Sequence, residues 1–79
     1  MNNITITKEL DLCGEVCPMN LFKTKIALKE LEIGEVLVVK LDSGEPIRSV
    51  SRGVKEDGHK IIKLEQNGDH FIVWIEKKM

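Results

Sequence analysis

The chain has 79 residues, enough for one small domain but not for a second core or a large substrate-enclosing cleft, so we expect a single domain over residues 1–79. Its hydrophobic content of 42% is too high for a disordered tail. With 12 basic and 13 acidic residues the net charge is −1, which argues against a generic nucleic-acid binder, so we expect no direct contact with nucleic acid.

The longest apolar runs, such as residues 71–75, are far too short to span a membrane. Residues 1–5 contain no basic segment leading into an apolar one, so we expect no signal peptide and a cytoplasmic protein. The two cysteines, Cys13 and Cys17, are too few for the disulfide framework of a small secreted domain. In a reducing compartment such a close pair is more often chemical than structural.

The first predicted element is a strand, because apolar residues recur at even positions: Ile4, Ile6, Leu10 and Leu12. Gly14 breaks this pattern, and Pro18 opens a predicted helix that runs to about Glu32. We expect Gly34 to close that helix as a left-handed cap. The core-facing side of the helix is predicted from the 3.6-residue spacing of Leu21, Thr24, Ala27, Leu28 and Leu31.

A second strand is predicted over residues 35–41, where β-branched residues dominate. After a turn, Pro46 suits the first turn of a second helix that ends at Gly58. The side of this helix that faces the core is predicted to carry Ile47, Val50 and Val54.

Two further strands are predicted over residues 60–65 and 70–76, joined by a hairpin at Asn67-Gly68 in which both residues take positive φ. On the last strand, alternation places one set of residues toward the helices, namely Phe71, Val73 and Ile75, and the other on the opposite face, namely Ile72 and Trp74. For Trp74 we expect a role in packing or self-association rather than chemistry.

The element order is therefore β-α-β-α-β-β. Strand–helix–strand units cross over with right-handed geometry, which places both helices on one face of the sheet. We predict an α/β (α+β) two-layer sandwich, with a four-stranded mixed sheet and two helices on one face.

The strand-to-helix junction carries the chemistry. If Pro18 is the first helical residue, Cys17 occupies the N-cap, and the unpaired amides of the first turn point toward its sulfur. Their partial positive charge favours thiolate over thiol and should lower the pKa of Cys17. Since thiolate is the nucleophile, Cys17 is the predicted reactive residue, supported by the turn at Gly14 and by Pro18.

Cys13 has two readings, a half-buried loop residue or a thiol that resolves a disulfide with Cys17. A zinc site needs about four ligands, and the only added candidates, His59 and His70, lie at far ends of a hairpin region. We therefore expect no metal and no cofactor.

The junction and its surroundings resemble the TusA/SirA-like sulfur-carrier proteins, whose signature is a Cys-Pro-x-Pro motif after a strand that ends in Asp-x-x-Gly. The matching residues are Asp11-Leu12-x-Gly14-x-x-Cys17-Pro18, Leu21-Phe22-Lys23-Thr24-Lys25-x-Ala27-Leu28, Leu31-x-x-Gly34-Glu35-Val36-Leu37, Pro46-Ile47-Arg48 and Gly58-His59. The resemblance covers about residues 9–76. Two positions depart from it: Asn20 replaces the second proline, and Cys13 stands where Arg or Ala is common.

The resemblance implies a sulfurtransferase-type carrier that holds sulfur as a persulfide on Cys17. It would take sulfur from a cysteine desulfurase or a rhodanese-type donor and pass it to an acceptor protein. Relatives serve tRNA thiolation, cofactor sulfuration or sulfur metabolism. Asp11 and Asn20 would support the site.

Around this sulfur, a second apolar lobe on the first helix is formed by Met19, Phe22 and Ile26. One interpretation is a docking patch for donor or acceptor, rimmed by the basic residues Lys23, Lys25, Arg48 and Arg52. In the other, Phe22 and Ile26 pack beneath a neighbouring element. Two functions compete with the carrier: a thiol–disulfide redox protein that uses both cysteines, and a non-catalytic regulatory domain that uses the open sheet face.

Overall fold

The computed structural model describes residues 6–15 and 19–79. The elements follow the order β1 (Ile6–Asp11), α1 (Met19–Lys29), β2 (Val36–Asp42), α2 (Glu45–Glu56), β3 (Lys60–Asn67) and β4 (His70–Glu76). This is the β-α-β-α-β-β order that the sequence predicts.

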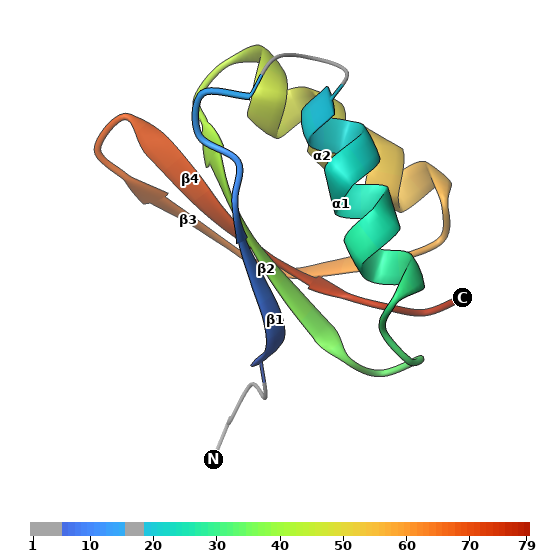
Figure 1. Cartoon of the computed structure of the whole chain (residues 1–79). Helices are drawn as coiled ribbons and strands as arrows, with labels where there is room; N and C mark the ends of the chain where they lie inside the picture. The colour runs from blue at the N-terminus through green and yellow to red at the C-terminus, as the bar shows by residue number, and fades with distance from the viewer. Residues whose placement is uncertain (1–5, 16–18) are drawn as a thin grey trace.

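The four strands form one mixed sheet in the order β1-β2-β4-β3. β1 runs parallel to β2, while β4 is antiparallel to both of its neighbours. Both helices cover the same face of this sheet, and no described helix covers the other face (Figure 1). The predicted two-layer sandwich is thus confirmed.

The core lies between the helices and the sheet, where β2 and β4 contribute side chains with no exposed surface, such as Val39 and Val73. The predicted alternation on β4 is confirmed, because Val73 and Ile75 are fully buried and Phe71 packs against the core. Trp74 lies on the open face, where the Nζ atom of Lys63 sits 4.8 Å from the ring centroid. This stacking supports a packing role for Trp74.

α1 ends earlier than the sequence predicts. The helix stops at Lys29, not Glu32, and the next two amides bond to carbonyls three residues back. The cap comes from the far end of the chain, where the Lys77 ammonium donates to the Leu31 carbonyl at 2.6 Å. Gly34 does have positive φ, but it turns the chain into β2, and its amide donates to the Lys77 carbonyl.

The end of α2 confirms the prediction at Gly58. This glycine has a φ of 90°, its amide bonds to the Lys55 carbonyl, and the His59 amide bonds to the Val54 carbonyl. These two bonds define a Schellman motif, which requires a left-handed residue where Gly58 stands. Inside the helix, Gly53 faces Leu21 of α1 so closely that any Cβ atom would collide with the leucine side chain.

The β3–β4 hairpin turns one residue later than predicted. Asn67 is still paired with His70, so the two turn residues are Gly68 and Asp69. Gly68 alone has positive φ, as a type II′ turn requires at its first central position. The Asn-Gly pair therefore marks the hairpin but not its turn type.

Candidate functional site

Cys17 and Pro18, the predicted nucleophile and the predicted first residue of the helix, lie outside the described residues. The site can still be built from the chain on either side of them. These parts are the loop after β1, residues 12–15, and the first turns of α1, which begins at Met19.

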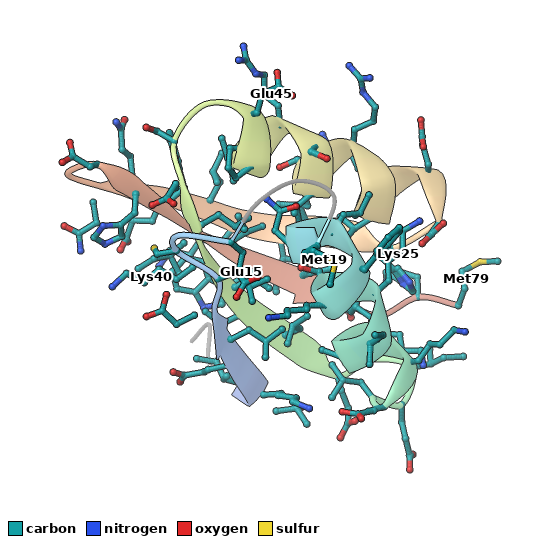
Figure 2. All side chains as sticks on the ribbon, turned by 45° about the horizontal axis from the view of Figure 1, so that its top comes forward. Glu15, Met19, Lys25, Lys40, Glu45 and Met79 are labelled. Atoms are coloured by element: carbon teal, nitrogen blue, oxygen red, sulfur yellow. The ribbon has the colours of Figure 1, made fainter. Side chains whose placement is uncertain are left out.

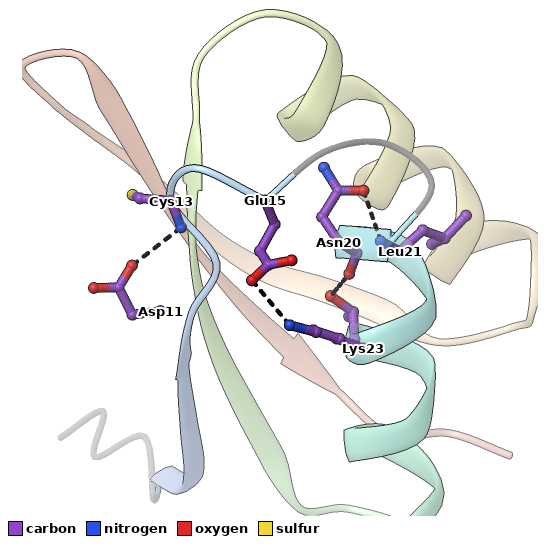
Figure 3. A network of polar contacts seen from close by, with 7 residues as sticks. Asp11, Cys13, Glu15, Asn20, Leu21 and Lys23 are labelled. Carbon is purple, nitrogen blue, oxygen red and sulfur yellow. Dashed lines mark hydrogen bonds and ion pairs between the residues drawn. The ribbon is translucent and has the colours of Figure 1, made fainter.

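The loop after β1 is a tight turn that the sequence motif explains. The Glu15 amide donates to the Leu12 carbonyl at 3.1 Å, and Gly14, in the third position, has a φ of 86°. A type II turn needs positive φ there, which is why this position is glycine. Asp11 accepts the Cys13 amide on its Oδ1 atom at 3.1 Å (Figure 3). Asp11 and Gly14 thus act on the shape of this turn.

Asp42, the last residue of β2, also holds this turn in place. Its role was not predicted from the sequence. Its Oδ2 atom accepts the Gly14 amide at 2.7 Å across 28 positions of sequence. Parallel pairing of β1 with β2 sets Asp11 opposite Lys40, so the ends of both strands meet at one edge of the sheet. The sequence signal is only an acidic residue at the end of a predicted strand.

Cys13 is free and half-buried in this turn. Burial raises the pKa of its thiol, and the neighbouring carboxylates of Asp11 and Asp42 raise it further because they disfavour a second negative charge. The bond from the Cys13 amide lowers the pKa of Asp11, which keeps that carboxylate ionised. Cys13 is therefore held as a thiol, the less nucleophilic form.

Asn20 lies fully buried in the first turn of α1. Its Oδ1 atom accepts the Leu21 amide at 2.7 Å, and its main-chain oxygen accepts the Thr24 hydroxyl at 2.8 Å. Figure 3 shows the first of these bonds and the side-chain nitrogen on its far side. That Nδ2 atom has no hydrogen-bond partner among the described residues, although buried donors normally have one.

Met19, Phe22 and Ile26 form one stripe along α1, which we call the α1 stripe. They are 43%, 50% and 59% exposed, so no described element covers them. This contradicts the reading in which Phe22 and Ile26 pack beneath a neighbour. The α1 stripe is an apolar surface available to another molecule.

The four basic residues predicted to rim this surface are divided between the two helices. Lys23 forms an ion pair with Glu15 at 2.9 Å, which ties α1 to the loop after β1. Lys25 pairs with Asp57 at 3.3 Å. Arg48 lies on the other helix, beside Glu45; Figure 2 shows Met19 and Lys25 on α1 and Glu45 on α2. Lys23 and Lys25 flank the α1 stripe on the same helix, whereas Arg48 and Arg52 belong to α2.

Neither a metal cluster nor a membrane-spanning helix is present in the described part of the chain. No group of three or more potential ligands is close enough to hold a metal ion there. No helix in that part is long and apolar enough to cross a membrane.

Comparison with known proteins gives consistent matches. The family model described as sulfurtransferase TusA matches residues 8–77. Proteins named "putative sulfur carrier protein" from Archaeoglobus fulgidus and Thermotoga maritima are each 37% identical; the first match covers 95% of this chain and 86% of the relative, the second 86% of each. The crystal structure of a SirA-like protein from Desulfitobacterium hafniense superposes with a TM-score of 0.79 at 27% identity, covering 92% of this chain and all of that one.

These matches span nearly the whole chain and agree with the observed order of strands and helices. The segment that they cover includes the turn after β1, Cys17 and the α1 stripe. The chain therefore belongs to the sulfurtransferase TusA family.

Proposed function

We propose that this protein carries sulfur as a persulfide on Cys17 and relays it to an acceptor protein. The observation that carries the proposal is the position of Cys17 within a chain of the TusA family, two residues before α1 begins at Met19. Amides at a helix start favour an anion, and both a thiolate and a persulfide anion are of that kind.

The relay consists of two displacements. The Cys17 thiolate attacks the outer sulfur of a donor persulfide; the donor's S–S bond breaks, its thiolate leaves, and a new S–S bond forms on Cys17. An acceptor thiolate then attacks the outer sulfur on Cys17, which restores the Cys17 thiolate. Each step exchanges one S–S bond for another and needs no external oxidant.

Asn20 fits this chemistry at the position where the motif has its second proline. Its side-chain nitrogen is a buried donor without a partner among the described residues, in the first turn of α1. A sulfur anion on Cys17 would be an acceptor for such a donor.

The partners follow from the same proposal. A cysteine desulfurase or a rhodanese-type protein would supply the sulfur, and tRNA thiolation, cofactor sulfuration or sulfur metabolism would consume it. The α1 stripe is the surface on which we place the contact with these proteins, because it is apolar, exposed and on the helix that follows Cys17. Persulfide chemistry without a disulfide framework suits the reducing cytoplasm.

The competing redox function is disfavoured by the surroundings of Cys13. A resolving thiol must attack as thiolate, but burial and two carboxylates raise the pKa of Cys13. The same surroundings protect a carrier, because attack by Cys13 on the inner sulfur of a Cys17 persulfide would expel sulfide and waste the cargo.

The test is intact mass spectrometry after incubation with a cysteine desulfurase and cysteine, or with a rhodanese and thiosulfate. The wild-type chain should gain the mass of one sulfur atom, Cys13→Ser should gain it equally and release sulfide no faster, and Cys17→Ser should gain none. If Cys13→Ser loses loading as completely as Cys17→Ser, the single-cysteine carrier is wrong. If Cys17→Ser still loads, the reactive cysteine is misassigned.

A further inference from the structure

A groove of about 780 Å³ lies between α2 and β3, away from the turn after β1. Its wall on one side is the outward surface of α2, and its floor is the helix-facing side of β3 and β4. Among the described residues discussed for sulfur transfer, only Arg48 and Arg52, two of the basic residues predicted to rim the docking patch, line this groove.

The floor of the groove is apolar. Leu64 is 53% exposed, although its cross-strand partner Val73 is fully buried on the helix face. Paired residues share a face, so Leu64 projects to the helix side but beyond the cover that α2 provides. Ile61 and Phe71 lie beside it, partly buried against the core.

The outer edge of β3 has no strand neighbour among the described residues, because β3 ends the sheet order. Its outward backbone amides and carbonyls are therefore available to pair with an added strand. The bulge between Ile61 and Lys63 leaves residues 63–67 in regular register with β4, so this part of the edge is straight enough to template one.

The wall of the groove is basic. Arg48, Arg52 and Lys55 line it from successive turns of α2, and Glu56 is the single acidic residue among the described residues that line it. Arg48 makes only a long, exposed contact with Glu45, at 3.6 Å. Arg52 and Lys55 form no ion pair with any other residue of the described segments. This is a local excess of positive charge on a chain whose net charge is −1.

We propose that this groove binds an extended acidic segment of a partner protein, which adds to the sheet as a strand along β3. Main-chain bonds to the edge would supply affinity. The side chains that the added strand presents to α2 would include apolar ones that rest on Leu64 and carboxylates that face Arg52 and Lys55. The proposal does not depend on Cys17, so it stands or falls separately from the sulfur relay.

Two other occupants fit less well. A second copy paired through β3 about a two-fold axis would place two α2 helices on the same face, with their basic rows opposed. A single-stranded RNA would need exposed aromatic rings for base stacking, but Phe71, the one aromatic ring that the described residues place in the groove, is partly buried in its floor.

The test is an amide NMR titration of the ¹⁵N-labelled full chain with an acetylated peptide of eight residues, the length of β3. The peptide carries Val and Glu in turn at every second position and Thr between them, so that Val and Glu share one face of the added strand. Shifts should concentrate in β3 and α2, and amide exchange along β3 should slow. The same peptide with every amide N-methylated should not bind, because it then has no N–H donor on either edge. Cys17→Ser should bind equally, which separates this result from the carrier function.

Variants sharpen the test. Arg52→Glu should raise the Kd about fivefold, and more at low salt, whereas Lys29→Glu, the same charge change on α1, should leave it within about twofold. Leu64→Ser should weaken binding without unfolding the chain, because the side chain is exposed. The proposal is overturned by an absence of shifts, by shifts on the α1 stripe or the open sheet face, or by equal binding of the N-methylated peptide. Dimerisation through β3 that excludes the peptide, or binding of oligouridylate in its place, would also overturn it.

Discussion

The two helices pack on the same face of the sheet but differ in which kinds of residue they bury and expose. α2 follows the usual pattern, with apolar residues such as Val50 and Val54 inside and charged residues outside. The first half of α1 inverts it, because Asn20 and Thr24 are fully buried while Phe22 and Ile26 are exposed. Sequences break local rules mainly where function requires it. Packing within the chain thus accounts for the pattern of α2 but not for that of the first half of α1, where we propose that partner proteins bind.

The largest expected effect is on the free energy of unfolding, and it should differ between the buried and the exposed face of α1. Leu28→Ala should lower the free energy of unfolding by about 2–4 kcal/mol, because the side chain is 2% exposed and its removal leaves a cavity. Phe22→Ala should change it by less than about 0.5 kcal/mol, because its surroundings are open. Urea denaturation followed by circular dichroism measures both. A large loss for Phe22→Ala would mean that the α1 stripe is structural.

The contact between the helices gives the next effect. In an exposed helix Gly53→Ala would stabilise by about 1 kcal/mol, but here the methyl group meets Leu21, so we expect a loss of about 1–3 kcal/mol. In the double variant with Leu21→Ala the methyl group has room, and the two losses should not add. A double-mutant cycle in urea measures this coupling. Purely additive losses would show that the helices are not in close contact there.

A kinetic prediction tests whether the inverted half of α1 serves partners. Phe22→Ala should slow sulfur loading from a cysteine desulfurase about tenfold, because exposed aromatic residues dominate such contacts. Loading from a small polysulfide, which needs no docking, should be unchanged. Stopped aliquots analysed by intact mass give both rates. Equal slowing with the two donors would place the effect on Cys17 rather than on docking.

The smallest effect concerns the turn that precedes α1. In a Cys17→Ser background, Cys13 should react with iodoacetamide more slowly than in the unfolded chain at pH 8, because its pKa is raised. Asp42→Asn removes one of the carboxylate charges, should bring the pKa down toward its usual value and speed alkylation a few-fold. The rate as a function of pH measures the shift directly. A rate in the folded chain that matches the unfolded one would remove the protection argument.

The raised pKa of Cys13 also predicts how the free energy of unfolding depends on pH. Since the folded-state pKa of Cys13 lies above that of the unfolded chain, its contribution to stability is present at neutral pH and lost as pH rises toward the folded-state pKa. Cys13→Ser should flatten this alkaline loss.

Much of the fold could be predicted because it follows from local periodicity. The period-2 pattern of Phe71 to Ile75 identified both faces of β4, and the glycine at position 58 marked the end of α2. Two features that the sequence did not reveal share a different cause. The end of α1 depends on Lys77, and the turn at Gly14 depends on Asp42, and neither partner is near in sequence. Contacts of this kind exist only after strands have paired.

The capping of α1 by Lys77 has a consequence for shortening the chain. The last strand ends at Glu76, so a fragment trimmed at the end of its secondary structure would keep every helix and strand. It would still lose the ammonium group on the Leu31 carbonyl and the backbone pair that joins residue 77 to Gly34 and Glu35. Tolerance to truncation follows hydrogen bonding rather than element boundaries. Lys77 thus holds the C-terminal end of the helix that carries the α1 stripe. A chain trimmed before residue 77 should therefore fray at that end of α1.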